Sequence, residues 1–287
     1  TGLVLVIALA AFFWREIPQK STSPRLQVAT SFYVLEDFVS RIAGNEVDLI
    51  AVAPIGVDAH EFEPTPQDVA KLSRAHLIFY HGGGLDPWAE RMAPEWIKNG
   101  ATVININEAV GGTSDPHRWL DPIFAQQYVE IIQEKLIAAD QDHAQIFIKH
   151  SEILLTDLRN LNADFEQGLT NCSLQEIIVS HDAFRYLGSR YRFSTIPISG
   201  ISHEEEPSPR KIAELATAAK EKGIATIFVE PLEAPDSAET LAKEIGGSTL
   251  DLNPIEGLTP KELSDGKDYI QLMKTNLAHL RVGMKCQ

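Results

Sequence analysis

The sequence has little positive charge. Its 287 residues include 25 lysines and arginines against 40 aspartates and glutamates, so the formal net charge is −15 at pH 7. Surfaces that bind nucleic acid are basic, because they neutralise phosphates. The acidic balance therefore argues against a nucleic-acid partner, and it is compatible with the attraction of cations.

Long hydrophobic runs are scarce as well. An apolar run from Leu3 to Trp14 is shorter than the roughly 20 residues that span a membrane, but it has the length of a signal-peptide apolar region. We expect residues 1–24 to be a signal peptide or an N-terminal anchor plus a linker; an ordinary buried strand or helix is the alternative. Export would place the folded part in the periplasm or another extracytoplasmic space, either released or held at the membrane by an uncleaved segment.

Cysteine is rare, with Cys172 and Cys286 as the two examples. An even number of cysteines in an exported protein favours a disulfide, whereas two unrelated buried thiols are the alternative. A Cys172–Cys286 bridge would join the C-terminus to the start of the second half of the chain.

Short apolar strands alternate with helical segments in both halves of the chain. We expect strands over residues 26–33, 47–52, 76–80, 101–106, 176–180, 193–198, 225–229 and 248–252. Between the halves, from Phe124 to Leu169, no strand pattern occurs, proline and glycine are absent until Gly168, and apolar residues recur at helical spacing. This stretch predicts one helix to about residue 139 and a second over 141–168, roughly 40 Å long at 1.5 Å per residue.

These elements predict an α/β fold of two Rossmann-like lobes, each with a mostly parallel sheet, joined by one long backbone helix. We place the N-terminal lobe at 25–125, the connecting helices at 126–170 and the C-terminal lobe at 171–287. In such sheets, ligands bind at the carboxyl ends of strands and between domains.

Three histidines lie at or just past the expected strand ends. His60 follows the second strand, His117 lies beyond the fourth, and His181 directly follows the first strand of the C-terminal lobe. His117 stands in Asp-Pro-His-Arg-Trp-Leu-Asp-Pro, where each proline restricts the backbone and presents the histidine on a stiff segment. Three imidazoles plus a carboxylate or water would form a tetrahedral site of the kind that zinc accepts.

The sequence leaves more than one candidate for the fourth ligand. Asp251 and Asn253 end the last strand of the C-terminal lobe, and Glu61 is next to His60. We expect Asp251 to bind the metal, with Asn253, Glu61 or water as alternatives. Other histidines are expected elsewhere: His81 could line the cleft, and His203 is either an auxiliary metal residue or part of a solvated acidic turn. The remainder are read as solvated on helices or as part of a strand (His76, His143, His150 and His279).

Four ordered motifs resemble a known family. They are Asp58-Ala-His-Glu-Phe-Glu-Pro-Thr-Pro, Asp115-Pro-His-Arg-Trp-Leu-Asp-Pro, His181-Asp-Ala-Phe-Arg-Tyr, and Glu230-Pro-Leu with Leu252-Asn-Pro-Ile-Glu-Gly-Leu. From about Leu26 to Cys286 the chain is similar to the metal-binding substrate-binding proteins of ABC transporters, the zinc/manganese group. The resemblance implies a receptor that captures Zn²⁺ between two lobes and delivers it to a membrane permease for uptake. Zinc members carry histidine at the position of His181, where manganese and iron members usually carry glutamate.

The chain departs from the family pattern in three places. Ala59 stands where the first motif usually has proline, and the short segment from Val110 to Ser114 stands where zinc members often have a long histidine- and acid-rich loop. At the fourth ligand position the family often has an aspartate followed by proline, and here that register gives Asn253.

Three alternatives to a zinc receptor remain at this point. One is a manganese or iron receptor of the same family, against which His181 argues, because imidazole favours zinc over manganese. Another is a zinc hydrolase with Glu61 as base. No His-Glu-x-x-His helix or nucleophile elbow supports it, so we expect no enzyme. An adhesion protein on the same scaffold is the third. We further expect a monomer whose zinc affinity falls as the pH drops through the histidine range, about 6.5.

Overall fold

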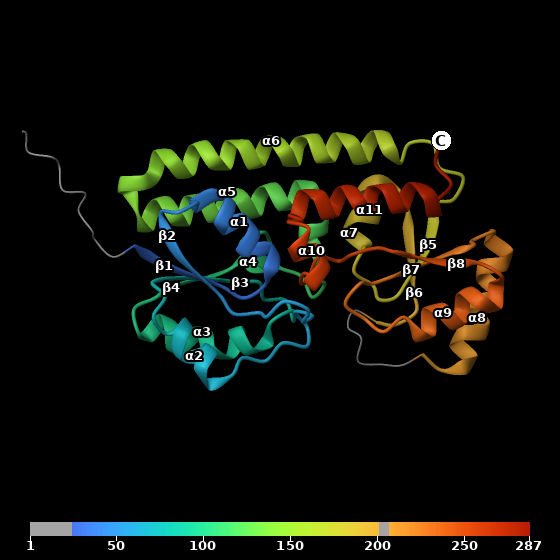
Figure 1. Ribbon diagram of the computed structural model, residues 1–287, viewed down its shortest axis with the longest axis horizontal. Coiled ribbons are helices and arrows are strands. Elements are labelled where there is room, and N and C mark those ends of the chain that lie inside the picture. Colours follow the sequence, from blue (N-terminus) through green and yellow to red (C-terminus); the bar gives the residue numbers. More distant parts are fainter. Residues whose placement is uncertain (1–24, 201–206) are drawn as a thin grey trace, which may run out of the picture.

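The structure, a computed structural model, describes residues 25–200 and 207–287. It has two four-stranded sheets, each entirely parallel, side by side beneath a layer of long helices (Figure 1). The first sheet has the order β2-β1-β3-β4 and the second the order β6-β5-β7-β8. The strands are β1 Leu26–Thr30, β2 Val47–Ala51, β3 Leu77–Tyr80, β4 Thr102–Asn105, β5 Glu176–Val179, β6 Ser194–Pro197, β7 Thr226–Val229 and β8 Ser248–Asp251. The predicted two-lobe α/β fold is confirmed.

Helices connect the strands and cover the sheets. In the first half they are α1 Tyr33–Ala43, α2 Pro66–Leu72, α3 Pro87–Lys98, α4 Ile106–Ala109, the 3₁₀ turn η1 His117–Leu120, α5 Pro122–Ala139, η2 Gln141–His143 and α6 Ala144–Gly168. In the second half they are α7 Arg185–Tyr191, α8 Pro209–Lys222, α9 Asp236–Ile245, α10 Pro260–Ser264 and α11 Tyr269–Gly283. The expected signal or anchor at residues 1–24, and His203, lie outside the described residues.

The long helix α6 runs across both lobes, as predicted (Figure 1). Its buried face carries apolar side chains at helical spacing, including Phe147, Leu154, Leu158 and Phe165. It begins three residues later than expected, because Asp140 caps a separate 3₁₀ turn by accepting a hydrogen bond from the His143 N–H. Helices α1, α5 and α11 pack against α6, so elements from both ends of the chain share this support.

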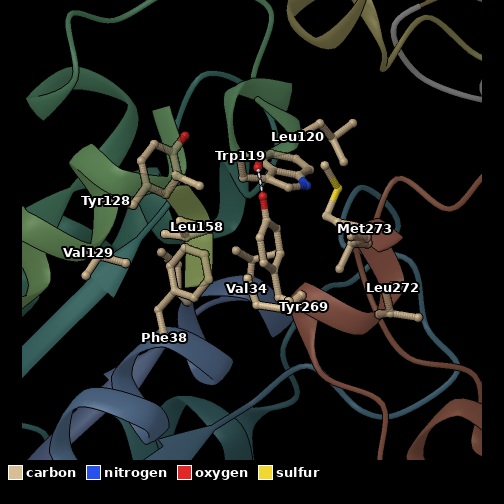
Figure 2. Close-up of a cluster of buried hydrophobic side chains, with 14 of the residues drawn as sticks. Val34, Phe38, Trp119, Leu120, Tyr128, Val129, Leu158, Tyr269, Leu272 and Met273 are labelled. Atoms are coloured by element: carbon tan, nitrogen blue, oxygen red, sulfur yellow. Dashed lines mark hydrogen bonds between the residues drawn. The ribbon is translucent and has the colours of Figure 1, made fainter. Parts of the chain in front are cut away.

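One continuous hydrophobic core passes through both lobes at η1. Trp119 packs there with Tyr128 and Tyr269, and the Tyr269 hydroxyl donates to the Trp119 carbonyl (Figure 2). The Trp119 indole N–H in turn donates to the carbonyl of Pro254, at 2.7 Å. The stiff segment that the sequence predicted around His117 is therefore fixed to α11 and to the chain after β8.

Cys172 and Cys286 form the expected disulfide, which joins the chain after α6 to the C-terminal residues. Lys285 and Met284 carbonyls accept hydrogen bonds from Ser173 and Leu174 beside it. Within the described residues, no helix is long and apolar enough to cross a membrane.

Candidate metal centre

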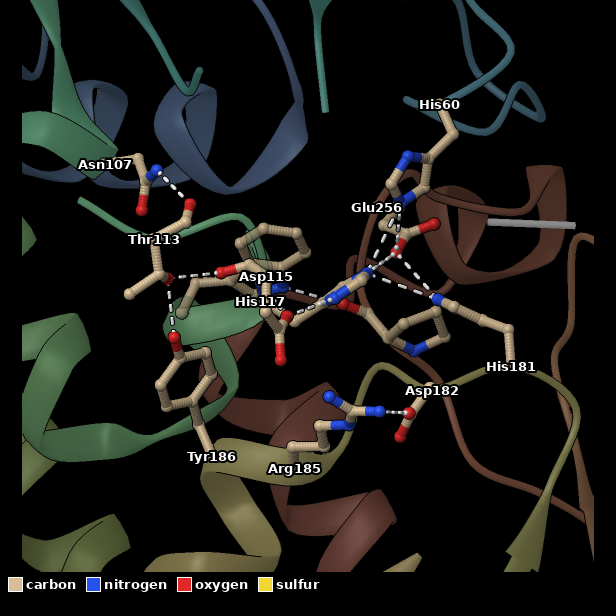
Figure 3. A network of polar contacts seen from close by, with 12 residues as sticks. His60, Asn107, Thr113, Asp115, His117, His181, Asp182, Arg185, Tyr186 and Glu256 are labelled. Carbon is tan, nitrogen blue, oxygen red and sulfur yellow. Dashed lines mark hydrogen bonds and ion pairs between the residues drawn. The ribbon is translucent and has the colours of Figure 1, made fainter. Parts of the chain in front are cut away.

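The three predicted histidines meet between the lobes. His60 comes from the loop after β2, His117 is the first residue of η1, and one residue, Ser180, separates His181 from the end of β5 (Figure 3). The Nε2 atom of His117 lies 3.3 Å from that of His60 and 3.2 Å from that of His181. His117 and His181 are completely buried, and the His60 side chain is 9% exposed.

A buried carboxylate, Glu256, completes the group. Its Oε1 lies 3.0 Å from the Nε2 atom of His117 and 3.5 Å from those of His60 and His181. One donor atom from each of the four residues lies within 4.8 Å of all the others. We call these four residues the ligand cluster.

The spacing of the ligand cluster fits a tetrahedral ion. Zinc bonds of about 2.0–2.1 Å imply distances of about 3.3–3.4 Å between neighbouring donor atoms in a tetrahedron. Five of the six distances between donor atoms are 3.0–3.5 Å, and the sixth, between His60 and His181, is within 4.8 Å. In addition, Glu256 is buried, and a further polar neighbour is the carboxyl of Asp58. A cation at the centre would offset the free-energy cost of burying this carboxylate.

Two outer carboxylates fix the rings in the form that binds metal. The His117 Nδ1–H donates to Asp115 Oδ1 at 2.9 Å, and the His181 Nδ1–H donates to Glu230 Oε1 at 2.6 Å. Because each Nδ1–H is held by a carboxylate, each ring turns its Nε2 into the cluster, where the lone pair of Nε2 is available to a metal once the ring is neutral. Asp115 also accepts a hydrogen bond from the backbone N–H of His117, so this one side chain fixes both the orientation of the His117 ring and the backbone at the start of η1.

The charges in the cluster shift one another's protonation. Burial alone would lower the pKa of His181, but the carboxylates of Glu230 and Glu256 outweigh burial and hold this pKa well above its usual value. Burial would raise the pKa of Glu256, yet the three surrounding histidines hold it well below its usual range. Burial and the charge of Glu256 raise the pKa of Asp58, whose Oδ1 accepts the His60 N–H, to about 9.

The structure does not bring the predicted Asp251 to the ligand cluster. Asp251 is exposed at the end of β8, and its backbone carbonyl accepts a hydrogen bond from the His279 ring. Of the alternatives, Glu61 is exposed, and Asn253 has a structural contact instead: its Oδ1 accepts the Ile255 N–H. The chain needs five residues beyond β8 to reach the centre, where Glu256 follows the left-handed residue Ile255.

Other histidines have separate partners. His81 was expected to line the cleft, but it is fully buried beneath it, with Nε2 2.8 Å from the Tyr128 hydroxyl and Nδ1 2.9 Å from the Gly82 carbonyl. Burial lowers the pKa of His81 to about 3, so it stays neutral. His143 and His150 contact Asp140 and the Ile42 carbonyl respectively, which places both away from the ligand cluster.

Comparison with known proteins gives consistent matches. Residues 28–283 match the family model described as zinc-uptake complex component A, periplasmic. The chain is 30% identical to the high-affinity zinc uptake system protein ZnuA of Bacillus subtilis, over 91% of this chain and 88% of that protein. It is 29% identical to the zinc-binding lipoprotein AdcA of Streptococcus pneumoniae, over 98% of this chain but 60% of AdcA. The zinc-bound ZnuA-like domain of that AdcA superposes with a TM-score of 0.81 at 31% identity, covering 91% of this chain and 99% of the domain.

Proposed function

The chain belongs to the family of periplasmic zinc-uptake complex component A proteins, and from that premise we propose that its ligand cluster captures Zn²⁺ as cargo for a membrane permease. The observation that carries the proposal is the convergence of three imidazole Nε2 atoms on one buried carboxylate oxygen. The donors are three nitrogens and one oxygen, a set that favours zinc over manganese, which prefers oxygen ligands. Zinc is here the transported substrate.

The closing of the fourth position by Glu256 supports a receptor over a hydrolase. Catalytic zinc sites keep one position open for water. Here four protein donors already surround the centre, and Glu61, the base that a hydrolase would use, is exposed and outside the cluster. We therefore propose a binding protein without catalytic activity.

The rest of the proposal concerns the setting of the protein. We infer a monomer in an extracytoplasmic space, released or held there by an N-terminal segment, and the disulfide supports an oxidising compartment. We retain the lobes as residues 25–125 and 171–287, with residues 126–170 as connecting helices. The partner is a permease of the ABC type, and no nucleic acid is involved.

Metal competition tests the function directly. We expect the purified chain to bind one Zn²⁺ per molecule by elemental analysis, and to keep it against a large excess of Mn²⁺ in a competitive titration. Equal competition by manganese would instead identify a manganese or iron receptor. Hydrolysis of an ester and peptide panel by the zinc-loaded chain would contradict a purely binding role.

The fourth ligand has a matched pair of variants. Glu256→Gln keeps the shape but removes the charge, and we expect zinc affinity to fall at least roughly tenfold, the lower end of the loss of an outer partner. Asp251→Asn makes the same chemical change at an exposed site and is expected to leave the affinity unchanged. A loss in Asp251→Asn with none in Glu256→Gln would restore the assignment of Asp251.

A further inference from the structure

The loop that carries His60 contacts the segment that carries Glu256 through backbone atoms. The Gly56 N–H donates to the Leu258 carbonyl at 2.8 Å. One residue further, the Val57 carbonyl lies against Gly257 so closely that a Cβ built on Gly257 would be 2.6 Å from its oxygen. Real Cβ atoms essentially never approach an atom that closely, so this contact depends on the missing side chain of Gly257.

The other end of the same loop is fixed in the N-terminal lobe. Ala59 is buried in the main core, and Phe62 packs edge-on against Trp88 with ring centroids 5.7 Å apart. The loop therefore spans from the core of one lobe to the chain after β8 in the other. His60 lies within this span, three residues from the contact with Gly257.

Within the described residues, the ring of His60 has no outer carboxylate partner, and the backbone N–H of His60 donates to Asp58 of the same loop. His117 is fixed by Asp115, His181 by Glu230, and the segment of Glu256 by the Trp119–Pro254 hydrogen bond. Because one core passes through both lobes, a wide opening of the lobes would expose buried apolar surface and is unfavourable. Of the four residues of the ligand cluster, His60 has the only partly exposed side chain, so it is the ligand that can move at least cost.

We propose that Gly257 is a positioning residue for zinc capture: its lack of a side chain lets the Val57 carbonyl approach and so places His60 at ligand distance. The inference rests on the proposed function, since it concerns the same ion. Gly257 lies outside the left-handed region of φ, so an alanine there meets no backbone strain and acts through its contacts with Val57 and with Leu232 Cδ1, at 3.2 Å.

Gly257→Ala is the direct test. We expect zinc to bind roughly 10–100-fold more weakly, as for the loss of a group that orients a ligand, with most of the change in the dissociation rate. Gly247→Ala is the matched control. A Cβ built on Gly247 would lie 2.1 Å from the Ala225 carbonyl oxygen, which is a worse clash. Gly247 directly precedes β8, however, and therefore lies at the end of that strand away from the ligand cluster. Gly247→Ala should lower the melting temperature of the zinc-free protein and leave zinc affinity unchanged.

A double variant separates positioning of His60 from damage to Glu256. If Gly257 acts through His60, then Gly257→Ala should change zinc affinity little in a His60→Ala background. Equal losses in both backgrounds would overturn the proposal, because the effect would then run through Glu256. If wild type itself binds no zinc, the proposed function fails; if wild type and Gly257→Ala bind zinc equally, this inference alone fails.

Hydrogen exchange on the wild-type chain covers the case in which the variant does not fold. The Gly56 amide, bonded to the Leu258 carbonyl, should exchange more slowly with zinc bound than without it, because zinc holds His60 and with it the loop. Rapid exchange at Gly56 in the zinc-loaded protein would overturn the proposal.

Discussion

Replacing His117 by alanine is expected to abolish high-affinity zinc binding. His117 is the central member of the ligand cluster, with its Nε2 within 3.3 Å of a donor atom from each of the other three residues. It is also completely buried, so no side chain can take its place without rearrangement of the core around Trp119. The loss should exceed the roughly 10–100-fold cost of removing an outer partner.

A graded series makes this result specific. Asp115→Ala leaves the imidazole of His117 in place but removes the acceptor of its Nδ1–H, and should weaken zinc binding by about 10–100-fold. His76→Ala removes an exposed histidine just before β3 and should have no effect. Affinities can be measured by competition with a chromophoric chelator, alongside melting curves without zinc. A His117→Ala protein that binds zinc like wild type would exclude the ligand cluster as the binding site.

The sequence carried enough information to predict the lobes and three of the four clustered residues. Strand ends are readable from apolar runs, and the carboxyl ends of parallel strands are where ligands bind. His60, His117 and His181 all occupy such positions, and the structure brings their Nε2 atoms together. Their assignment as zinc ligands stays a prediction until the variants are measured.

Glu256 could not be found by the same rule. It lies beyond the strand end on an irregular segment, whose course depends on partners distant in sequence. Asn276 accepts the Asn253 N–H and donates to its carbonyl, and Trp119 donates to Pro254. Ile255 then takes a left-handed φ of 61°, which is unfavourable for a β-branched residue and is held by these contacts. The nearest signal in the sequence was a glutamate between Pro254 and Gly257, directly after the last strand.

Zinc affinity is expected to rise with pH across the neutral range. In the zinc-free protein, burial opposes a charge on His181, but Glu230 and Glu256 hold its pKa well above the usual value, so it keeps a proton at neutral pH. Zinc must displace that proton, because only the free lone pair of Nε2 binds metal. For each proton displaced, affinity should rise about tenfold per pH unit until the pKa of His181 is passed.

The stability of the zinc-free fold should change in the opposite direction. A group whose pKa is higher in the folded than in the unfolded chain stabilises the fold. This contribution is fully present below the pKa of the unfolded chain, about 6.5 for histidine, and it is lost as the pH rises through the pKa of the folded chain. The melting temperature of the zinc-free protein should therefore fall as the pH rises, while the rise in melting temperature on adding zinc should become larger.

Glu230→Gln removes one of the two carboxylates that raise the pKa of His181, so the zinc affinity of this variant should level off at a lower pH than that of wild type. Calorimetric titrations and melting curves between about pH 6 and 9 measure both trends, over the range in which histidine titrates. An affinity that is flat across this range would show that His181 holds no proton for zinc to displace.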